Sequence, residues 1–148
     1  MQALSTIGYE RASPETFLAT LQAAGVTLLL DVREAPISRR PGFAKNALRD
    51  ALHAEGIDYR HEQRLGAPKS LRDGIRFERW SYPEFFARYR DHLAAQQDVL
   101  ARLVDNLQGH IALMCYERDH RECHRCVVAE AMAQRTGVQP RHLHPEAG

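Results

Sequence analysis

One run of apolar residues most constrains the fold of this chain. Residues 26–32 are almost continuously apolar and follow Gly25, a residue type that commonly ends a helix. An apolar run of this length is typical of a strand that is buried on both faces, and such strands belong to parallel sheets. Because parallel strands are joined by long crossover connections, the run predicts a helix on each side of it.

Strand-like and helix-like segments alternate along the rest of the chain. Further strands are expected at residues 4–7, 57–61, 110–115 and 141–143. Helices are expected at residues 14–24 and 44–55, from Ser81 to Gly109, and from a capping box at Asp119 and Glu122 to Thr136.

Residues 62–80 are polar and irregular, and their length indicates a functional or mobile loop. The order of the segments as a whole predicts a single α/β domain over residues 1–148, with three layers and a mostly parallel, Rossmann-like sheet.

The composition excludes several classes of protein. Three cysteines cannot all pair within one chain, and no leader pattern opens the sequence, so a secreted disulfide framework is not expected. No apolar run approaches the roughly 20 residues that span a bilayer. The formal net charge of +1 excludes a strong overall field for polyanions, so any anion site is local. We therefore expect a cytoplasmic protein that does not associate with membranes, and the oligomeric state stays open.

Polar residues follow four of the expected strands. They are Gly8-Tyr9, Asp31 to Arg33, His61-Glu62 and Cys115 to Glu117. Because the carboxyl ends of parallel strands meet at one edge of a sheet, where ligands usually bind, these residues are expected to line a common pocket.

Cys115 allows two interpretations. A thiol at the end of an apolar strand is often buried and inert. Cys115 and Arg121 nevertheless have the Cys-x5-Arg spacing with which phosphatases and sulfurtransferases wrap a loop around an anion, and Cys115 would then be a nucleophile. The intervening Glu117 and Asp119, and the lack of a glycine between Cys115 and Arg121, disfavour such a loop.

Cys123 and His124 are expected in the first turn of a helix, where the helix dipole lowers a thiol pKa and favours an anion. Cys123 and Cys126 also form a Cys-x-x-Cys pair, but other marks of a thioredoxin-like unit are lacking, so a redox role is the weaker interpretation. Cys115, Cys123 and Cys126 with His120 or His124 match a zinc site in residue type but not in spacing, so no metal site is expected.

The segment from Arg33 to Arg49 holds five basic residues and a single acid, which makes it the best candidate for an anion site. Ser38 and Arg39 lie in it close to Phe43, and this mixture of a hydroxyl, a cation and an aromatic ring is used for phosphate contact and base stacking. An ordinary solvent-exposed run of charged residues, without any ligand, would have the same sequence.

Two carboxylates, Asp31 and Glu117, follow expected strands. Asp31 and Arg33 can exchange hydrogen bonds with a ligand, and Glu117 can act as an acid or a base if burial raises its pKa. An internal ion pair between such an acid and an arginine would instead only shape the edge of the sheet. The sequence leaves both interpretations open.

Several spaced motifs occur in order along the chain. They are Thr6-Ile7-Gly8-Tyr9, Asp31-Val32-Arg33 with Pro36, Ser38-Arg39 and Phe43, Leu65-Gly66, and Cys115-x-Glu117 followed by Cys123-His124-Arg125. In these motifs the chain resembles the family called domain of unknown function 488. The resemblance implies a compact α/β domain without a settled activity.

The resemblance also suggests the positions of a site. They are Tyr9, Asp31, Arg33, Ser38, Arg39, Cys115, Glu117, Cys123, His124 and Arg125. The chain departs from the family pattern at Cys126, where a serine is usual, and at Ala67, where a second glycine is common after Leu65-Gly66.

The leading functional hypothesis is a domain that binds a phosphate-bearing ligand, either a small molecule such as a nucleotide, or a nucleic acid. The sequence leaves open whether the domain also acts on this ligand. Arg33, Arg39 and Arg125 would bind phosphates, with Tyr9 and Ser38 nearby. The alternatives are a thiol enzyme that uses Cys115 and a non-catalytic interaction module. The sequence identifies no cofactor.

Overall fold

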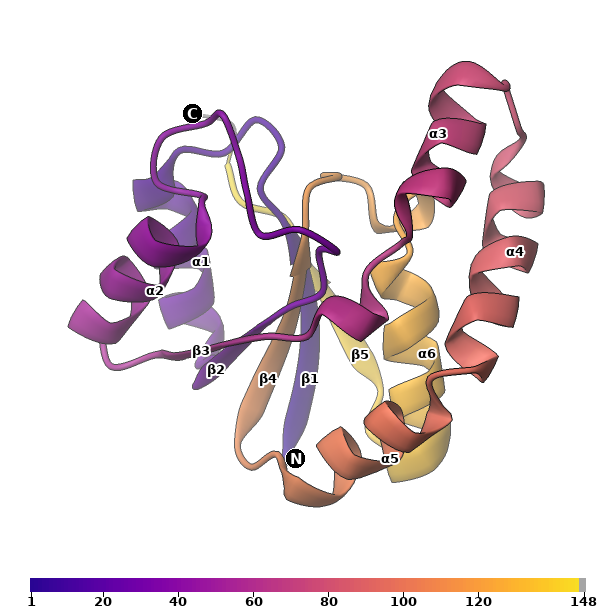
Figure 1. The fold of residues 1–148 in the computed structure, drawn as a ribbon. Coiled ribbons are helices and arrows are strands. Elements are labelled where there is room, and N and C mark those ends of the chain that lie inside the picture. Colours follow the sequence, from indigo (N-terminus) through magenta and orange to yellow (C-terminus); the bar gives the residue numbers. More distant parts are fainter. Residues whose placement is uncertain (147–148) are drawn as a thin grey trace.

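The computed structural model describes residues 1–146, and a parallel sheet of five strands forms its centre (Figure 1). The strands are β1 (Ala3–Gly8), β2 (Leu28–Asp31), β3 (Asp58–His61), β4 (His110–Cys115) and β5 (Pro140–Leu143). Their order across the sheet is β3-β2-β4-β1-β5. The mostly parallel α/β sheet expected from the sequence is therefore confirmed.

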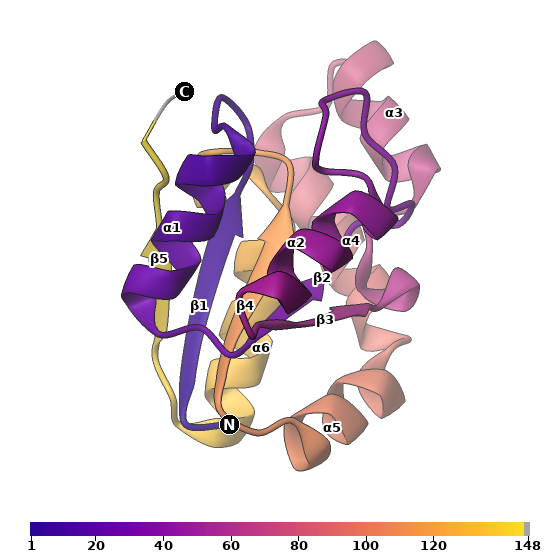
Figure 2. The same ribbon diagram turned by 90° about the vertical axis from the view of Figure 1, so that its left-hand side faces the viewer.

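Helices cover both faces of the sheet, which gives three layers (Figures 1 and 2). One face carries α1 (Pro14–Ala24) and α2 (Lys45–Ala54), and the other carries α4 (Tyr82–Ala94), α5 (Gln97–Asn106) and α6 (Arg125–Thr136). The short helix α3 (Lys69–Phe77) packs on α4 beside the carboxyl edge. Two 3-10 turns, η1 (Gln63–Leu65) and η2 (His120–Glu122), lie in the connections.

The core is divided by the sheet into two apolar clusters because the central strands are buried on both faces. Leu30, Ile111 and Leu113 pack toward α4, α5 and α6, whereas Leu29 and Met114 pack toward α1 and α2. This alternation follows from the period of two along a strand. It explains why the apolar run at residues 26–32 was the strongest signal for the fold.

The helix expected from Ser81 to Gly109 is wrong in its length, because two helices occupy this segment. Ser81 caps α4, which ends at Ala94, and the chain turns at Ala95 and Gln96 before α5. A single helix over residues 82–106 would extend roughly 37 Å. It would overrun a sheet whose strands have four to six residues, so the break lets α5 turn back and pack on α6.

The segment at residues 62–80 is not a loop throughout, since it contains η1 and α3. Leu71, Gly74 and Ile75 share one side of α3, and Gly74 lies directly under the ring of Trp80. The helix has no side-chain cap and no acidic residue in its first turn, so the sequence lacks the usual signals of a helix start at this point.

The capping box expected at Asp119 and Glu122 is also wrong. The Asp119 side chain accepts a hydrogen bond from the Arg121 backbone N–H, and this caps only η2. Cys123 has an extended backbone, and α6 begins at Arg125 with His124 at its N-cap. Cys123 and His124 therefore precede the helix instead of lying in its first turn.

The register of the sheet brings the expected polar groups to one edge. Gly8 pairs with Cys115, and Asp31 pairs with Met114 and with His61. The connection after β1 leads to α1 on one face, and the connection after β4 leads to α6 on the other. Such a divergence opens a crevice at the carboxyl edge, where ligands bind in open α/β sheets. Within residues 1–146, no helix combines the length and apolar character needed to cross a membrane.

Candidate active site at the carboxyl edge

A cavity of about 410 Å³ lies at the carboxyl edge of the sheet, and we call it the edge cavity. Side chains from the ends of three strands and from α3 and α4 form its walls. They include Tyr9, Arg33, Glu34, Lys69, Arg72, Phe85, Cys115, Tyr116, Glu117, Glu122 and His124. Five of the ten site positions suggested by the sequence thus reach the cavity wall: Tyr9, Arg33, Cys115, Glu117 and His124.

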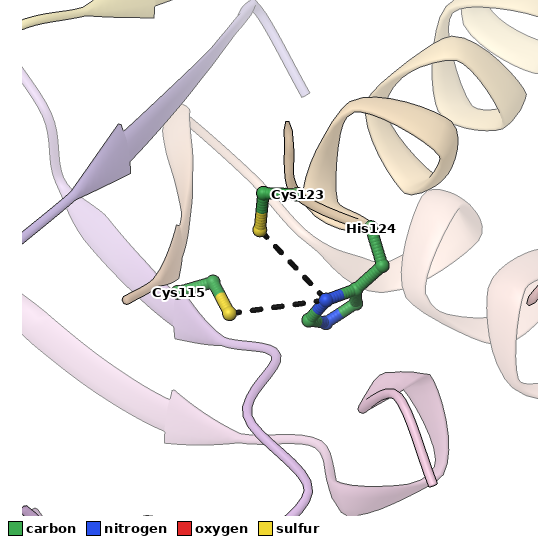
Figure 3. A group of neighbouring side chains, drawn as sticks. All are labelled: Cys115, Cys123 and His124. Atoms are coloured by element: carbon green, nitrogen blue, oxygen red, sulfur yellow. Dashed lines mark hydrogen bonds between the residues drawn. The ribbon is translucent and has the colours of Figure 1, made fainter. Parts of the chain in front are cut away.

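Two sulfur atoms and one imidazole converge beside this cavity, which Cys115 and His124 line; Figure 3 shows the three side chains pointing toward one another. The Nδ1 atom of His124 lies 3.8 Å from the Sγ atom of Cys115 and 3.8 Å from the Sγ atom of Cys123. Cys115 comes from the end of β4, and the other two residues directly precede α6. All three side chains are buried. We refer to Cys115, Cys123 and His124 as the sulfur–imidazole cluster.

The ring of His124 is held in place by atoms from other elements. Its Nε2 atom lies 2.7 Å from the carbonyl oxygen of Val32, which can only accept a hydrogen bond, so Nε2 carries a proton. The ring of Tyr89 packs at 5.1 Å from the imidazole, and the Tyr89 hydroxyl donates to the carbonyl of Leu65 at 2.6 Å. The Nδ1 atom is consequently fixed toward the two sulfur atoms.

The two thiols of the cluster have opposite tendencies to ionise. Hydrogen bonding to Cys123 and burial raise the pKa of Cys115 well above its ordinary value. Burial opposes the ionisation of Cys123 as well, but Cys115 and the charge of His124 outweigh it and lower the pKa of Cys123 well below its ordinary value. Of the two thiols, Cys123 is therefore the one that ionises more readily, and Cys115 lines the cavity.

Glu117 lies beside the cluster on the cavity wall. Its Oε2 atom is buried and has no hydrogen-bond partner among residues 1–146. Burial and the neighbouring Cys123 raise the pKa of Glu117 to about 8. The carboxyl group is therefore protonated at neutral pH and can donate a hydrogen bond.

Asp31 and Arg33 form a buried, hydrogen-bonded network beside the cavity, and Arg33 reaches the cavity wall. The Asp31 carboxylate accepts from Arg33 Nη2 at 2.7 Å, from Arg33 Nε at 2.9 Å and from the Tyr59 hydroxyl at 2.6 Å. Arg33 also donates to the Phe43 carbonyl at 2.8 Å and to the Tyr9 hydroxyl at 3.4 Å. Burial opposes the charge on Arg33, but Asp31 outweighs it and raises the pKa of Arg33. The internal ion pair is thus the role that the structure gives Asp31.

Arg125 is completely buried and holds the loop that follows β4. Its Nη1 atom donates to the Glu117 carbonyl at 2.5 Å, and Nη2 donates to the Arg118 carbonyl at 3.3 Å. Arg125 does not line the edge cavity. The structure therefore does not bring Arg125 together with Arg33 as a phosphate contact, and it gives Arg125 the role of positioning Glu117.

Two glycines allow the loops of the edge to approach closely. A Cβ atom on Gly8 would lie 1.8 Å from the Glu117 carbonyl oxygen, and one on Gly66 would lie 2.3 Å from the backbone of Glu34. The close approach at Gly66 occurs although Ala67 follows it. Both contacts set the positions of residues that line the cavity.

Ser38 and Arg39 lie away from the cavity wall. The Ser38 hydroxyl accepts from the backbone N–H of Arg40, and the Arg39 side chain is exposed. The neighbouring Arg40 donates to the carbonyls of Tyr9 and Ala12 and so ties this loop to the end of β1.

Arg121 and Cys126 stand apart from the sulfur–imidazole cluster. Arg121 pairs with Asp119 at 2.9 Å, is 79 % exposed and borders a different hollow from the one that Cys115 borders. The Cys-x5-Arg spacing consequently forms no anion loop around Cys115. Cys126 is half-buried beside Glu130 and His142, and burial raises its pKa to about 11, which disfavours a redox pair with Cys123.

Some residues of the site gave no signal of this role in the sequence. Lys69 and Arg72 come from a segment that was expected to be a loop, although a functional one. Tyr89 had a core pattern, and Tyr59 lies in an edge strand. These four side chains gather near the carboxyl edge of the sheet only because the fold brings distant segments of the chain together.

The comparisons with known proteins identify a family and nothing finer. The model of the family described as domain of unknown function DUF488 matches residues 13–132. The chain belongs to this family. No curated protein and no solved structure matches the chain. The family assignment confirms the resemblance noted from the motifs.

Proposed function

We propose that the protein is an enzyme that acts on a small polar substrate in the edge cavity, with Glu117 exchanging a proton with that substrate. The observation that carries this proposal is the buried Oε2 atom of Glu117, which lacks a hydrogen-bond partner among residues 1–146 on the wall of a cavity. Buried polar atoms normally have partners, and the exceptions often mark reactive sites. A bound substrate would supply the missing partner.

The surroundings of Glu117 support this role. Arg125 and the close contact with Gly8 fix the backbone carbonyl of Glu117, so the carboxyl group has a defined position. Phe85 and the ring of Tyr116 add apolar surface to the cavity wall. Apolar walls with a few placed polar groups are typical of small-molecule sites.

We propose a phosphate-bearing compound, such as a nucleotide, as the substrate class. Lys69 and Arg72 line the cavity from α3, and the exposed ring of Tyr116 offers a surface for stacking at its mouth. Arg72 is paired with Glu34 at 2.6 Å and Lys69 with Asp73 at 2.7 Å. A phosphate would compete with these carboxylates, so we expect weak binding that decreases with salt.

Fluorescence anisotropy with labelled nucleotides and short oligonucleotides tests the substrate class. Binding by the wild type should be lost in a Lys69→Ala/Arg72→Ala variant and kept in Arg49→Ala, which removes an exposed arginine outside the cavity. Equal binding by both variants, or none by the wild type at low salt, would remove phosphate-bearing compounds from the proposal.

The role of Glu117 is tested separately by mass spectrometry. The wild type, Glu117→Gln and the control Glu130→Gln are each incubated with a nucleotide collection and with a cell extract, and the compounds consumed are compared. The wild type and the control should consume the same compounds, and Glu117→Gln should consume none of them. Consumption by Glu117→Gln at the wild-type rate, or no consumption by the wild type, would contradict the proposal.

A further inference from the structure

The sulfur–imidazole cluster has the composition of a metal site. The Sγ atoms of Cys115 and Cys123 and the Nδ1 atom of His124 all lie within 4.8 Å of one another. Thiolate and imidazole are the donors that zinc prefers in proteins. Two thiolates would also balance the charge of a divalent cation, so the occupied site would bury no net charge.

The two sulfur-to-nitrogen distances in the cluster are close to those of a tetrahedral site. Zinc bonds of about 2.3 Å to sulfur and 2.0–2.1 Å to nitrogen place a sulfur and a nitrogen ligand about 3.5 Å apart at a tetrahedral angle. Both Sγ-to-Nδ1 distances in the cluster are 3.8 Å. A contraction of roughly 0.3 Å at each pair would bring both sulfur-to-nitrogen distances to the tetrahedral value.

The orientation of His124 provides a second, independent observation. Its Nε2–H donates to the Val32 carbonyl at 2.7 Å, which directs the opposite nitrogen at both sulfur atoms. A histidine that binds a metal usually donates its other ring N–H to a carbonyl or a carboxylate in this way. The support comes from β2, whereas the sulfur ligands come from β4 and the segment before α6, so the fold itself assembles the arrangement.

We infer that Cys115, Cys123 and His124 bind a zinc ion, with a fourth position that opens to the edge cavity. Cys115 and His124 both line the cavity, so the ion would be reachable from it. Catalytic zinc sites have three protein ligands and one exchangeable ligand, whereas structural sites are closed by four. This inference goes beyond the proposed role of Glu117 and does not depend on it.

The spacing of the cysteines and histidines in the sequence argued against a zinc site, because it lacks the two closely spaced ligand pairs that zinc sites usually have. The fold supplies the third ligand from a strand end eight residues before Cys123, and Cys126 takes no part in the group of donors. Cys126 therefore serves as a matched control: it is a cysteine of the same chain, close in sequence, outside the cluster.

Metal content of the purified full chain tests the inference. The protein is prepared without a chelating tag, loaded with zinc, passed through a desalting column and analysed by inductively coupled plasma mass spectrometry. We expect about one equivalent of zinc in the wild type and in Cys126→Ser, and near-complete loss in Cys115→Ser, Cys123→Ser and His124→Gln. Far-ultraviolet circular dichroism establishes which variants fold.

X-ray absorption at the zinc edge of the wild-type protein gives a second measurement that needs no variant. Two sulfur neighbours and one imidazole in the first shell are the expected result. A wild type that retains no zinc, a first shell of oxygen and nitrogen only, or an equal loss of zinc in Cys126→Ser would overturn the inference. None of these outcomes depends on turnover, so they leave the test of Glu117 separate.

Discussion

Two groups of buried polar side chains lie on neighbouring strands at the same edge of the sheet, yet their hydrogen bonding differs. In the first, at the end of β2, the Asp31 carboxylate accepts hydrogen bonds from Arg33 and Tyr59, and both of its oxygens are used. In the second, at the end of β4, the Oε2 atom of Glu117 has no partner among the described residues. The first group is thus satisfied within the protein, whereas the second leaves one buried oxygen without a partner among the described residues.

The comparison teaches that a charged residue after a buried strand is an ambiguous signal. Asp31 and Glu117 look alike in the sequence, and both were candidates for acid–base chemistry. The difference lies in the number of donors that the fold delivers to each carboxyl group. A buried carboxylate with several donors is satisfied within the fold, whereas one with an unpartnered oxygen needs a further partner, which we propose is the substrate.

The largest effect should come from breaking the satisfied group. Asp31→Ala leaves the buried guanidinium of Arg33 without its carboxylate, so we expect the free energy of unfolding to fall by about 3–5 kcal/mol in urea denaturation. Asp50→Ala, which removes the partner of the exposed Arg49, should change it little. Similar small losses in both variants would show that the Asp31 network does not stabilise the fold.

A smaller loss should follow from Gly8→Ala, which disturbs the backbone contact between the end of β1 and the loop that carries Glu117. The added methyl group would meet the Glu117 carbonyl at 1.8 Å, so the loop after β4 has to move. We expect a loss of about 1–3 kcal/mol in the free energy of unfolding, measured in the same way. An unchanged stability would mean that the loop accommodates the methyl group and that Gly8 does not position Glu117.

Glu117→Gln should change stability by less than about 1 kcal/mol, because an amide has the shape of the protonated carboxyl group and no hydrogen bond of Oε2 is lost. The same urea titration measures it. A loss as large as that of Asp31→Ala would show that Glu117 stabilises the fold as Asp31 does, and would contradict the difference between the two groups.

The smallest effect concerns a residue outside both groups. His142 stacks on His120, and burial together with the charges of His120 and Arg125 lowers its pKa to about 4. The unfolded chain binds this proton near pH 6.5, so the unfolded state holds more protons between these values. His142 therefore makes the free energy of unfolding decrease as the pH falls from about 6.5 to about 4.

The His142→Gln variant should show a shallower decrease over this pH range than the wild type, as measured by urea midpoints. The control His53→Gln, on the exposed side of α2, should keep the wild-type slope. An unchanged slope in His142→Gln would show that other groups cause the dependence.

The sequence predicted the sheet because its central strands are apolar on both faces, and it predicted the gathering of Tyr9, Arg33, Cys115 and Glu117 at one edge because parallel strands share a direction. It missed α3 and the break before α5. No capping side chain marks the start of α3, and Ala95 and Gln96, where the chain turns, are residue types that favour helices, so neither boundary shows in the sequence.

The roles within the site could not be read from the chain because backbone atoms of distant segments decide them. Arg33 and Arg125 were expected to bind phosphate, and in the structure each donates to a backbone carbonyl of another segment, Arg33 to Phe43 and Arg125 to Glu117. The orientation of His124 depends on a carbonyl of Val32, 92 positions away in the sequence. A backbone carbonyl of a distant segment cannot be predicted from the type of the side chain that donates to it.

The most direct test of the distinction between the two groups is the turnover number of Glu117→Gln, measured with the first compound that the wild type consumes and corrected for the folded fraction. If Glu117 transfers a proton to the substrate, turnover falls at least about 100-fold while the folded fraction is unchanged. A fall that only follows the folded fraction would show that Glu117, like Asp31, serves the structure alone.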